Sequence, residues 1–299
     1  MTVAWVFSGG GALGAVQAGM VRAVAESGDP IGRPDVLVGV SVGALNAAYL
    51  SAGVDEARVA ALWQMWRSDI VTGLGAESLI PKLARLARFE RHVASPAPLG
   101  HLIDRLCESH DPALDDLADA RVPLHIATSV LATGAQQWFT AGDARRVLLA
   151  SASVPGVLPP VDIDGVEHID GAIHTALPVH RAVEGGADVV VAFTVPRFAD
   201  PTADRLGAAG VVLRAMSISR WANIPDAIPG VELHVIEADV PAPSASALGR
   251  VPEYLYAGYA AGLAHLRDRR APVAEKRRLL SRRTAKAPAV LAGDVEPPR

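Results

Sequence analysis

Residues 5–19, "WVFSGGGALGAVQAG", are typical of a buried strand, a glycine-rich loop and the start of a helix. The loop contains G-x-G-x-x-G at Gly9, Gly11 and Gly14, the spacing that cradles the pyrophosphate of a dinucleotide at a helix N-terminus. The same backbone amides can instead face another negative charge. The loop alone leaves both interpretations open, and the residues after the second strand decide between them.

The second predicted strand, "DVLVGV" at residues 35–40, ends without the acidic residue that binds the ribose hydroxyls in a dinucleotide site. It continues into G-x-S-x-G at Gly39, Ser41 and Gly43. Between a strand and a helix, this motif predicts a nucleophile elbow. The glycines let neighbouring backbone pass, and the helix N-terminus favours negative charge that develops at the serine. The alternative is that Ser41 is a plain helix N-cap.

The order of elements predicts an α/β fold. Within the first 55 residues, continuous apolar strands alternate with helices, which indicates a mostly parallel central sheet covered by helices on both faces. Further strands are expected at residues 122–130, 135–140, 188–195 and 231–240, and further helices at 143–153, 180–187 and 252–270. No strand is assigned to the proline-punctuated stretch 154–179.

Residues 55–120 are expected to be helical, with Leu62, Trp63 and Trp66 in the core. Within this region, residues 78–93 place basic and apolar side chains on opposite sides of a helix. The basic set is Lys82, Arg85, Arg88 and Arg91, and the apolar set is Leu79, Leu83, Leu86 and Val93. Such a helix can lie on an anionic membrane surface, and a helix that covers a soluble core shows the same pattern.

The composition restricts the class of protein. Of 299 residues, 50% are hydrophobic and 20% charged, as in a globular chain, and the net charge of -4 argues against nucleic acid as the main partner. The single cysteine, Cys107, excludes an internal disulfide, suits a reducing compartment and is expected to be a buried or incidental thiol. We find no signal-peptide pattern and no apolar run of about 18 residues, so a cytoplasmic location is expected.

A serine nucleophile also needs donors for the oxyanion and a general base. Loops that follow neighbouring parallel strands meet at one edge of the sheet, which places the amides of Gly9, Gly10 and Gly11 near Ser41. No motif marks any of the nine histidines as the base. Surface or packing roles are favoured for the three nearest to Asp170 in the sequence, which are His168, His174 and His180.

Three segments together resemble the patatin-like phospholipase family. They are "SGGGALGAVQAGM" (8–20), "GVSVGALNA" (39–47) and "LLASASVPGVLPPVDIDGVEHIDGAIHTALPV" (148–179). They carry a glycine loop, G-x-S-x-G, an Ala-Ser-x-x-x-Pro segment leading to Pro-Pro, and Asp-Gly-Ala, in the family order from about residue 3 to 195. The resemblance implies a three-layer α/β/α fold and hydrolysis of acyl-lipid esters, with no metal or organic cofactor.

The resemblance also implies a Ser-Asp dyad in which Ser41 is the nucleophile and Asp170 the general base. A carboxylate close to a serine hydroxyl can take its proton if partial burial raises the carboxylate's pKa. Gly171 allows a sharp turn beside the site, and Ala172, where many relatives have a second glycine, adds little bulk. Asp-Gly is also common where a turn aspartate binds its own backbone.

One departure from the family bears on the substrate. Leu13 stands where many members carry Arg or Lys, a cation that can hold a phosphate headgroup, so the case for phospholipids over neutral esters is weaker.

The expected hydrolase domain covers residues 1–270, with 55–120 as a helical cover or acyl-facing wall, and 271–299 form a flexible basic tail. Two other classes stay open: a non-catalytic lipid-binding or scaffold protein, and a nucleotide-dependent oxidoreductase supported only by the glycine spacing. The headgroup and oligomeric state are not predicted.

Overall fold

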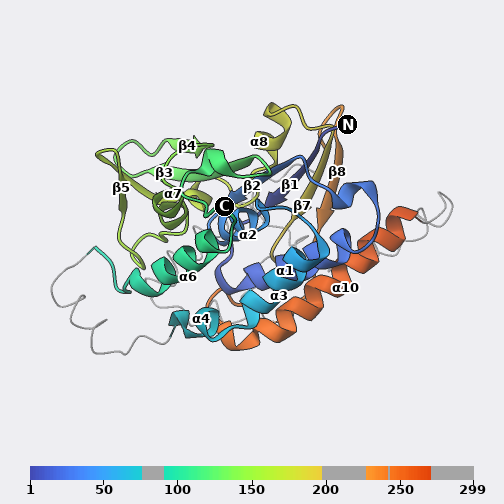
Figure 1. The fold of residues 1–299 in the computed structure, drawn as a ribbon, viewed down its shortest axis with the longest axis horizontal. Helices are drawn as coiled ribbons and strands as arrows, with labels where there is room; N and C mark the ends of the chain where they lie inside the picture. The colour runs from blue at the N-terminus through green and yellow to red at the C-terminus, as the bar shows by residue number, and fades with distance from the viewer. Residues whose placement is uncertain (76–90, 197–226, 242, 271–299) are drawn as a thin grey trace, which may run out of the picture.

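A computed structural model describes residues 1–75, 91–196, 227–241 and 243–270 (Figure 1). Most of the predicted amphipathic helix 78–93 and all of the tail 271–299 lie outside the described residues. The strands are β1 (Val3–Phe7), β2 (Val36–Val40), β3 (Leu124–Val130), β4 (Gln136–Phe139), β5 (Val161–Ile163), β6 (Val166–Asp170), β7 (Val189–Phe193) and β8 (Glu232–Ile236). The helices are α1 (Gly14–Ala25), α2 (Val42–Leu50), α3 (Glu56–Arg67), α4 (Asp69–Thr72), α6 (Ala97–Glu108), α7 (Ala144–Ser151), α8 (Val179–Glu184) and α10 (Val251–Arg270).

The strands form one eight-stranded sheet whose centre is parallel. β3, β2, β1, β7 and β8 lie side by side in that order with parallel pairing, while β4, β5 and β6 pair antiparallel. The apolar runs of β1 and β7 are buried along their whole length, because helices cover both faces of the sheet. The predicted mostly parallel α/β sheet is confirmed.

Alternate side chains of β1 belong to two different hydrophobic cores, as the pleat of a strand requires. Trp5 and Phe7 face a large core shared with α1, α2, α3, α6 and α10, whereas Ala4 and Val6 face a smaller core that includes Val179 of α8. Figure 1 shows α1, α3 and α10 along one face of the sheet and α8 on the other. The three-layer α/β/α architecture is therefore confirmed.

The described helices of residues 55–120 pack into the larger core. Leu62, Trp63 and Trp66 of α3 are buried, as predicted. Cys107 of α6 is also buried, and this burial raises the pKa of its thiol to about 11. The thiol is therefore protonated near neutral pH, which fits the expectation of an inert cysteine.

The stretch 154–179 contains a β-hairpin that the sequence analysis did not assign. β5 and β6 pair antiparallel around Asp164 and Gly165, which both have positive φ angles, 53° and 82°. Two successive residues of this kind form the tight turn that Asp-Gly favours between strands. The alternation of apolar and polar residues in "VDIDGVEHI" was the available signal for the two strands. The prolines that precede it favoured the prediction of an irregular chain instead.

β3 is a long strand whose pairing positions two segments for the site described below. β4 pairs with residues 126–129 along one edge of β3, so β2 and β6 both pair along the other edge. β2 runs parallel to β3 until Val40 lies opposite Ala127. β6 arrives from the opposite direction and ends with Asp170 opposite Thr128. The ends of β2 and β6 therefore meet on one edge of β3.

Candidate active site

Ser41 lies at the sharp turn between β2 and α2, in the conformation expected of a nucleophile elbow. It is not glycine, yet its backbone has φ 56° and ψ -130°. The glycine at position 43 permits the turn, because a Cβ there would lie 2.5 Å from the carbonyl oxygens of Phe7 and Ser8. At Gly39 a Cβ would lie 2.6 Å from the Gly43 carbonyl oxygen. The Ser41 side chain makes no capping hydrogen bond to α2, so the plain N-cap interpretation does not describe it.

The Ser41 hydroxyl donates instead to Asp170. Its Oγ lies 2.7 Å from Oδ2 of the carboxylate, and the two residues are 7% and 2% exposed. The other carboxylate oxygen, Oδ1, accepts from the Ala172 amide at 2.8 Å. Asp170 is thus a turn aspartate that binds its own backbone and also the hydrogen-bond partner of Ser41. The tight turn depends on Gly171, where a Cβ would collide with the Ala127 carbonyl.

The histidines near Asp170 in the sequence do not bind the Ser41 hydroxyl. His168 is buried, its Nδ1 lies 2.9 Å from the Thr128 hydroxyl, and its ring packs edge-on against Phe139. Burial lowers the pKa of His168. His174 and His180 are exposed. These placements agree with the packing and surface roles favoured from the sequence.

The glycine loop lies directly against Ser41, but its first amide is already in use. The Gly9 amide donates to the Ala176 carbonyl at 3.0 Å, so the expectation that this amide faces the oxyanion is corrected. The role of Gly9 is to leave space, because a Cβ there would lie 3.0 Å from the Ala172 Cβ and 3.2 Å from the Ser41 Cβ. Among the described residues, the Gly10 and Gly11 amides have no hydrogen-bond acceptor.

Two contacts from distant segments hold the glycine loop in place. The Ala12 amide donates to the Ala245 carbonyl at 2.7 Å, which fastens the loop to the segment that precedes α10. At the start of the loop, the Ser8 hydroxyl accepts from the Val195 amide at 3.0 Å, beyond the end of β7. The loop is therefore fixed from both sides.

A buried polar network under the loop connects it to α2, the helix that follows Ser41. The Gln17 amide nitrogen donates to the Ser8 carbonyl at 2.8 Å, and Asn46 donates to the Gln17 side-chain oxygen at 2.9 Å. The Trp66 indole donates to the Asn46 oxygen at 2.9 Å. This network was not predicted from the sequence. The available signal was one amide side chain in each of the mostly apolar helices α1 and α2.

Leu13, the residue that departs from the family pattern, is fully buried and does not reach solvent.

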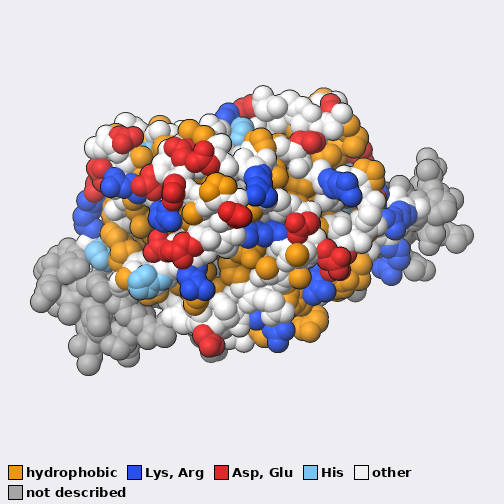
Figure 2. Space-filling view, in the orientation of Figure 1, with side chains coloured by type: hydrophobic (Ala, Val, Ile, Leu, Met, Phe, Trp, Pro, Cys, Tyr) orange, Lys and Arg blue, Asp and Glu red, His pale blue; other side chains and the backbone are white. Residues whose placement is uncertain are grey.

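Among the described residues, no three His, Cys, Asp or Glu side chains are grouped so as to hold a metal ion. Basic and acidic side chains are interspersed over the face that Figure 2 shows, with hydrophobic side chains between them. No described helix is both long enough and apolar enough to cross a bilayer.

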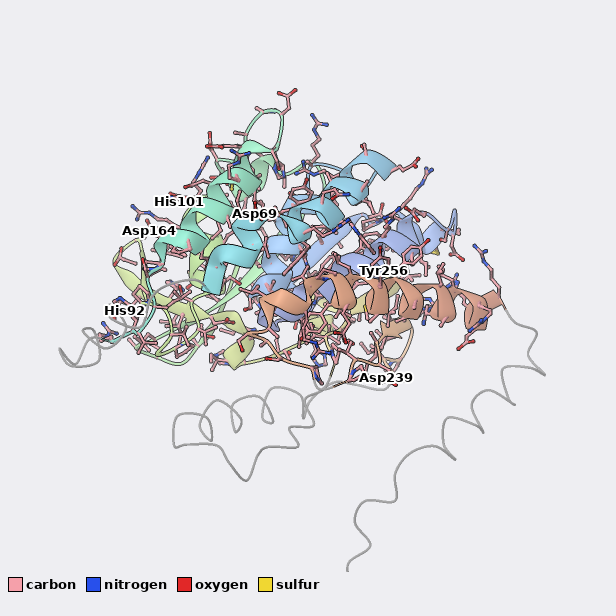
Figure 3. The ribbon with its side chains drawn as sticks, turned by 90° about the horizontal axis from the view of Figure 1, so that it is seen from below. Asp69, His92, His101, Asp164, Asp239 and Tyr256 are labelled. Atoms are coloured by element: carbon pink, nitrogen blue, oxygen red, sulfur yellow. The ribbon has the colours of Figure 1, made fainter. Side chains whose placement is uncertain are left out.

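A cavity of about 560 Å³ lies between the end of β8 and α10, at the edge of the sheet where the parallel strands end and the glycine loop begins. Its lining includes Pro196, next to the Val195 side chain against which Gly10 lies, and the acidic residues Glu237 and Asp239. Figure 3 shows Asp239 beside α10. None of the described residues that line this cavity is Lys or Arg.

The chain is similar in sequence to known proteins. Residues 5–183 match the sequence profile of the family described as patatin-like phospholipase. The chain is 28% identical over 195 residues to the rat patatin-like phospholipase domain-containing protein 7, an alignment that covers 64% of this chain and 13% of that protein. It is 27% identical over 210 residues to lysophospholipase nte1 of Neurospora crassa, covering 69% of this chain and 13% of that protein.

Among solved structures, VipD from Legionella pneumophila is similar with a TM-score of 0.44 and 14% identity, over 89% of this chain and 66% of that one. The chain spans about an eighth of the length of the curated relatives named above. The family profile covers more than half of the chain and includes the glycine loop, the elbow and the Asp-Gly-Ala turn. This chain belongs to the patatin-like phospholipase family.

Proposed function

We propose that this chain hydrolyses carboxylic ester bonds of acyl lipids, with Ser41 as the nucleophile and Asp170 as the general base. The observation that carries the proposal is the 2.7 Å hydrogen bond from the Ser41 hydroxyl to the buried Asp170 carboxylate. A base within hydrogen-bond reach of a strained, buried serine is the arrangement that activates a nucleophile. Family membership and relatives named as phospholipases support the same reaction class.

In the acylation half-reaction, Ser41 Oγ bonds to the acyl carbon while Asp170 Oδ2 takes the hydroxyl proton. The carbonyl electron pair moves onto its oxygen, and the amides of Gly10 and Gly11 are the donors available to this oxyanion. When the tetrahedral intermediate collapses, the bond to the alcohol oxygen breaks. The alcohol leaves with the proton that Asp170 held, and the acyl group stays on Ser41.

In the deacylation half-reaction, water takes the place of the alcohol. Asp170 accepts a proton from the water as its oxygen bonds to the acyl carbon, and the same two amides stabilise the second oxyanion. Collapse breaks the bond to Ser41 Oγ, which recovers the proton from Asp170. The products are a free carboxylic acid and the original enzyme, and the cycle uses only residues of this chain and water.

The proposed substrates are acyl lipids whose recognition does not depend on a cation in the glycine loop. Leu13 is fully buried at the position where many relatives carry a basic residue, and the nearby cavity contains carboxylates. Neutral esters and monoacyl lipids are therefore expected to be better substrates than lipids with strongly anionic headgroups. We assign this activity to residues 1–270 and leave the tail 271–299 outside the catalytic unit.

Labelling with a fluorophosphonate probe tests the proposal. The wild-type protein is compared with the Ser41→Ala and Asp170→Asn variants, and with Asp164→Asn as a matched control at an exposed carboxylate of the β5–β6 turn. Asparagine at 170 keeps an oxygen for the Ala172 amide but cannot take the serine proton. We expect one adduct on Ser41, none in Ser41→Ala, labelling slowed about 100-fold or more in Asp170→Asn, and no change in Asp164→Asn.

Ester hydrolysis is then measured on monoacyl phospholipid, triacylglycerol and short-chain esters. Labelling of Asp170→Asn at the wild-type rate would show that another group is the base. A folded wild-type protein that is neither labelled nor active, with and without lipid vesicles, would contradict the proposal and favour a non-catalytic lipid-binding protein.

A further inference from the structure

A buried serine outside the proposed dyad is bonded to the backbone of Ser41. Ser151 is the last residue of α7 and is fully buried. Its Oγ accepts a hydrogen bond from the Ser41 amide at 3.0 Å and donates one to the Ala127 carbonyl at 2.7 Å. Both roles of this hydroxyl are therefore occupied, and both partners are backbone groups at the meeting point of β2, β3 and β6.

The position of Ser41 in the sheet explains why its amide needs such a partner. The parallel ladder between β2 and β3 ends where Val40 lies opposite Ala127, one residue before Ser41. The positive φ of Ser41 then turns the chain away from β3, so the next strand no longer supplies an acceptor. A buried amide without an acceptor is unfavourable, and the Ser151 hydroxyl takes the place of the missing strand partner.

The second hydrogen bond of Ser151 connects this amide to the edge where Asp170 lies. The Ala127 carbonyl accepts from Ser151, and the same carbonyl lies against the backbone of Gly171, directly after Asp170. The Ser151 hydroxyl thus links the backbone of Ser41 to the segment that positions Asp170. A shift of the elbow would break one or both hydrogen bonds.

We propose that Ser151 is a positioning residue: its hydroxyl holds the strained Ser41 backbone so that the Ser41 Oγ faces Asp170. The inference rests on the proposed function for its catalytic consequence, because Ser151 itself touches neither substrate nor reacting atoms. It assigns a physical role to the Ala-Ser-x-x-x-Pro segment, whose serine lies 110 residues from the nucleophile in the sequence.

The neighbouring serine provides a matched control. Ser153 is equally buried, but its hydroxyl donates to the Leu149 carbonyl at 2.8 Å within its own segment. Its backbone carbonyl accepts from the Asp170 amide at 2.9 Å, and an alanine substitution keeps that carbonyl. We would compare Ser151→Ala, Ser153→Ala and Ser151→Thr, which keeps the hydroxyl. The measurements are the rate of fluorophosphonate labelling, kcat and KM on a short-chain ester, the melting temperature, and hydrogen exchange at the Ser41 amide.

We expect Ser151→Ala to slow labelling and lower kcat by about 10- to 100-fold with little change in KM, because the misplaced nucleophile affects the chemical step. Exchange of the Ser41 amide should become faster in Ser151→Ala only. Ser153→Ala should retain the wild-type rates, even if both alanine variants lose a similar amount of thermal stability. Ser151→Thr should retain most of the labelling and of the exchange protection.

Equal labelling rates in Ser151→Ala and Ser153→Ala would overturn the inference, and so would a Ser41 amide that exchanges at the wild-type rate in Ser151→Ala. Equal losses in Ser151→Thr and Ser151→Ala would also overturn it, because the hydroxyl would then not be the group that matters. A wild-type protein that is not labelled contradicts the proposed function alone. In that case the exchange comparison still decides whether Ser151 holds the elbow.

Discussion

At the scale of single residues, the candidate site combines one strained residue with glycines that let the backbone approach it. A non-glycine residue with the φ of Ser41 costs about 1–3 kcal/mol, and it persists only where its surroundings hold it. Here the surroundings are the Ser151 hydroxyl, the Asp170 carboxylate and the close-packed glycine loop. The strain is therefore offset by contacts from three segments that are distant in the sequence.

Gly11 is expected to be needed for its space as well as for its backbone conformation. Its φ is +57°, and a Cβ would lie 2.5 Å from the Ala245 carbonyl oxygen that holds the loop. Gly28 is a matched control, because its φ is +67° and nothing lies within 4 Å of a Cβ there. Gly28→Ala should lower the free energy of unfolding by about 1–2 kcal/mol and leave labelling of Ser41 unchanged.

Gly11→Ala should lower the free energy of unfolding further and slow labelling roughly 100-fold, the scale of losing one oxyanion donor. Urea unfolding and the labelling rate measure the two effects. If both alanine variants lose the same stability and keep the wild-type labelling rate, then the contact between Gly11 and Ala245 does not position the loop.

At the scale of elements, the long strand β3 and the α1–α10 pair position the two halves of the site. β3 offers one edge to both β2 and β6, and this brings Ser41 to Asp170. α1 begins directly after the glycine loop and lies along α10. Their approach is close, because a Cβ at Gly258 of α10 would collide with the Val16 carbonyl of α1. The packing of α10 therefore supports the helix that starts at the loop.

Gly258→Ala should lower the free energy of unfolding by about 1–3 kcal/mol, because the added methyl group forces the two helices apart. Gly100→Ala in α6 is the control, since nothing lies within 4 Å of a Cβ at Gly100 and alanine is the better helix former. That variant should raise the free energy of unfolding by about 0.5–1 kcal/mol. Urea unfolding of both variants measures the difference, and two effects of the same sign would contradict the close helix contact.

At the scale of the whole molecule, buried histidines make the fold sensitive to mild acid. Burial lowers the pKa of His110, His125, His168 and His234, and neighbouring arginines lower it further in all but His168. The unfolded chain therefore binds more protons than the folded protein below the ordinary histidine pKa of about 6.5. The contribution of these histidines to the free energy of unfolding is fully present above that pH, and it is lost as the pH falls through and below it.

The free energy of unfolding in urea should therefore be lower at pH 5.5 than at pH 8. His110→Gln should reduce the difference between the two pH values. The sign of the effect is fixed by the direction of the pKa shifts. Equal stability of the wild-type protein at the two pH values would contradict the buried, neutral state of these side chains.

Local patterns in the sequence predicted most of the fold. The apolar runs of β1, β2 and β7 predicted buried parallel strands, and glycine and serine spacing predicted the loop and the elbow. The β5–β6 hairpin was not assigned, although its Asp-Gly turn is a local signal. Gly9, Gly10 and Gly11 are equivalent in the sequence, yet the Gly9 amide is bonded to Ala176. Contacts of this kind join segments that are far apart in the sequence and come together only when the chain folds.

The sequence by itself determined the parallel strands and the helices that alternate with them, the G-x-S-x-G elbow and the Asp-Gly-Ala turn, because each is a property of a few consecutive residues. Only the tertiary structure decided that Ser41 and Asp170, which are 129 residues apart, share a hydrogen bond. The physical reason is the register of β3, along which one strand ends at the serine and another ends at the aspartate. The Ser151 hydroxyl then satisfies the amide that this junction leaves without a strand partner.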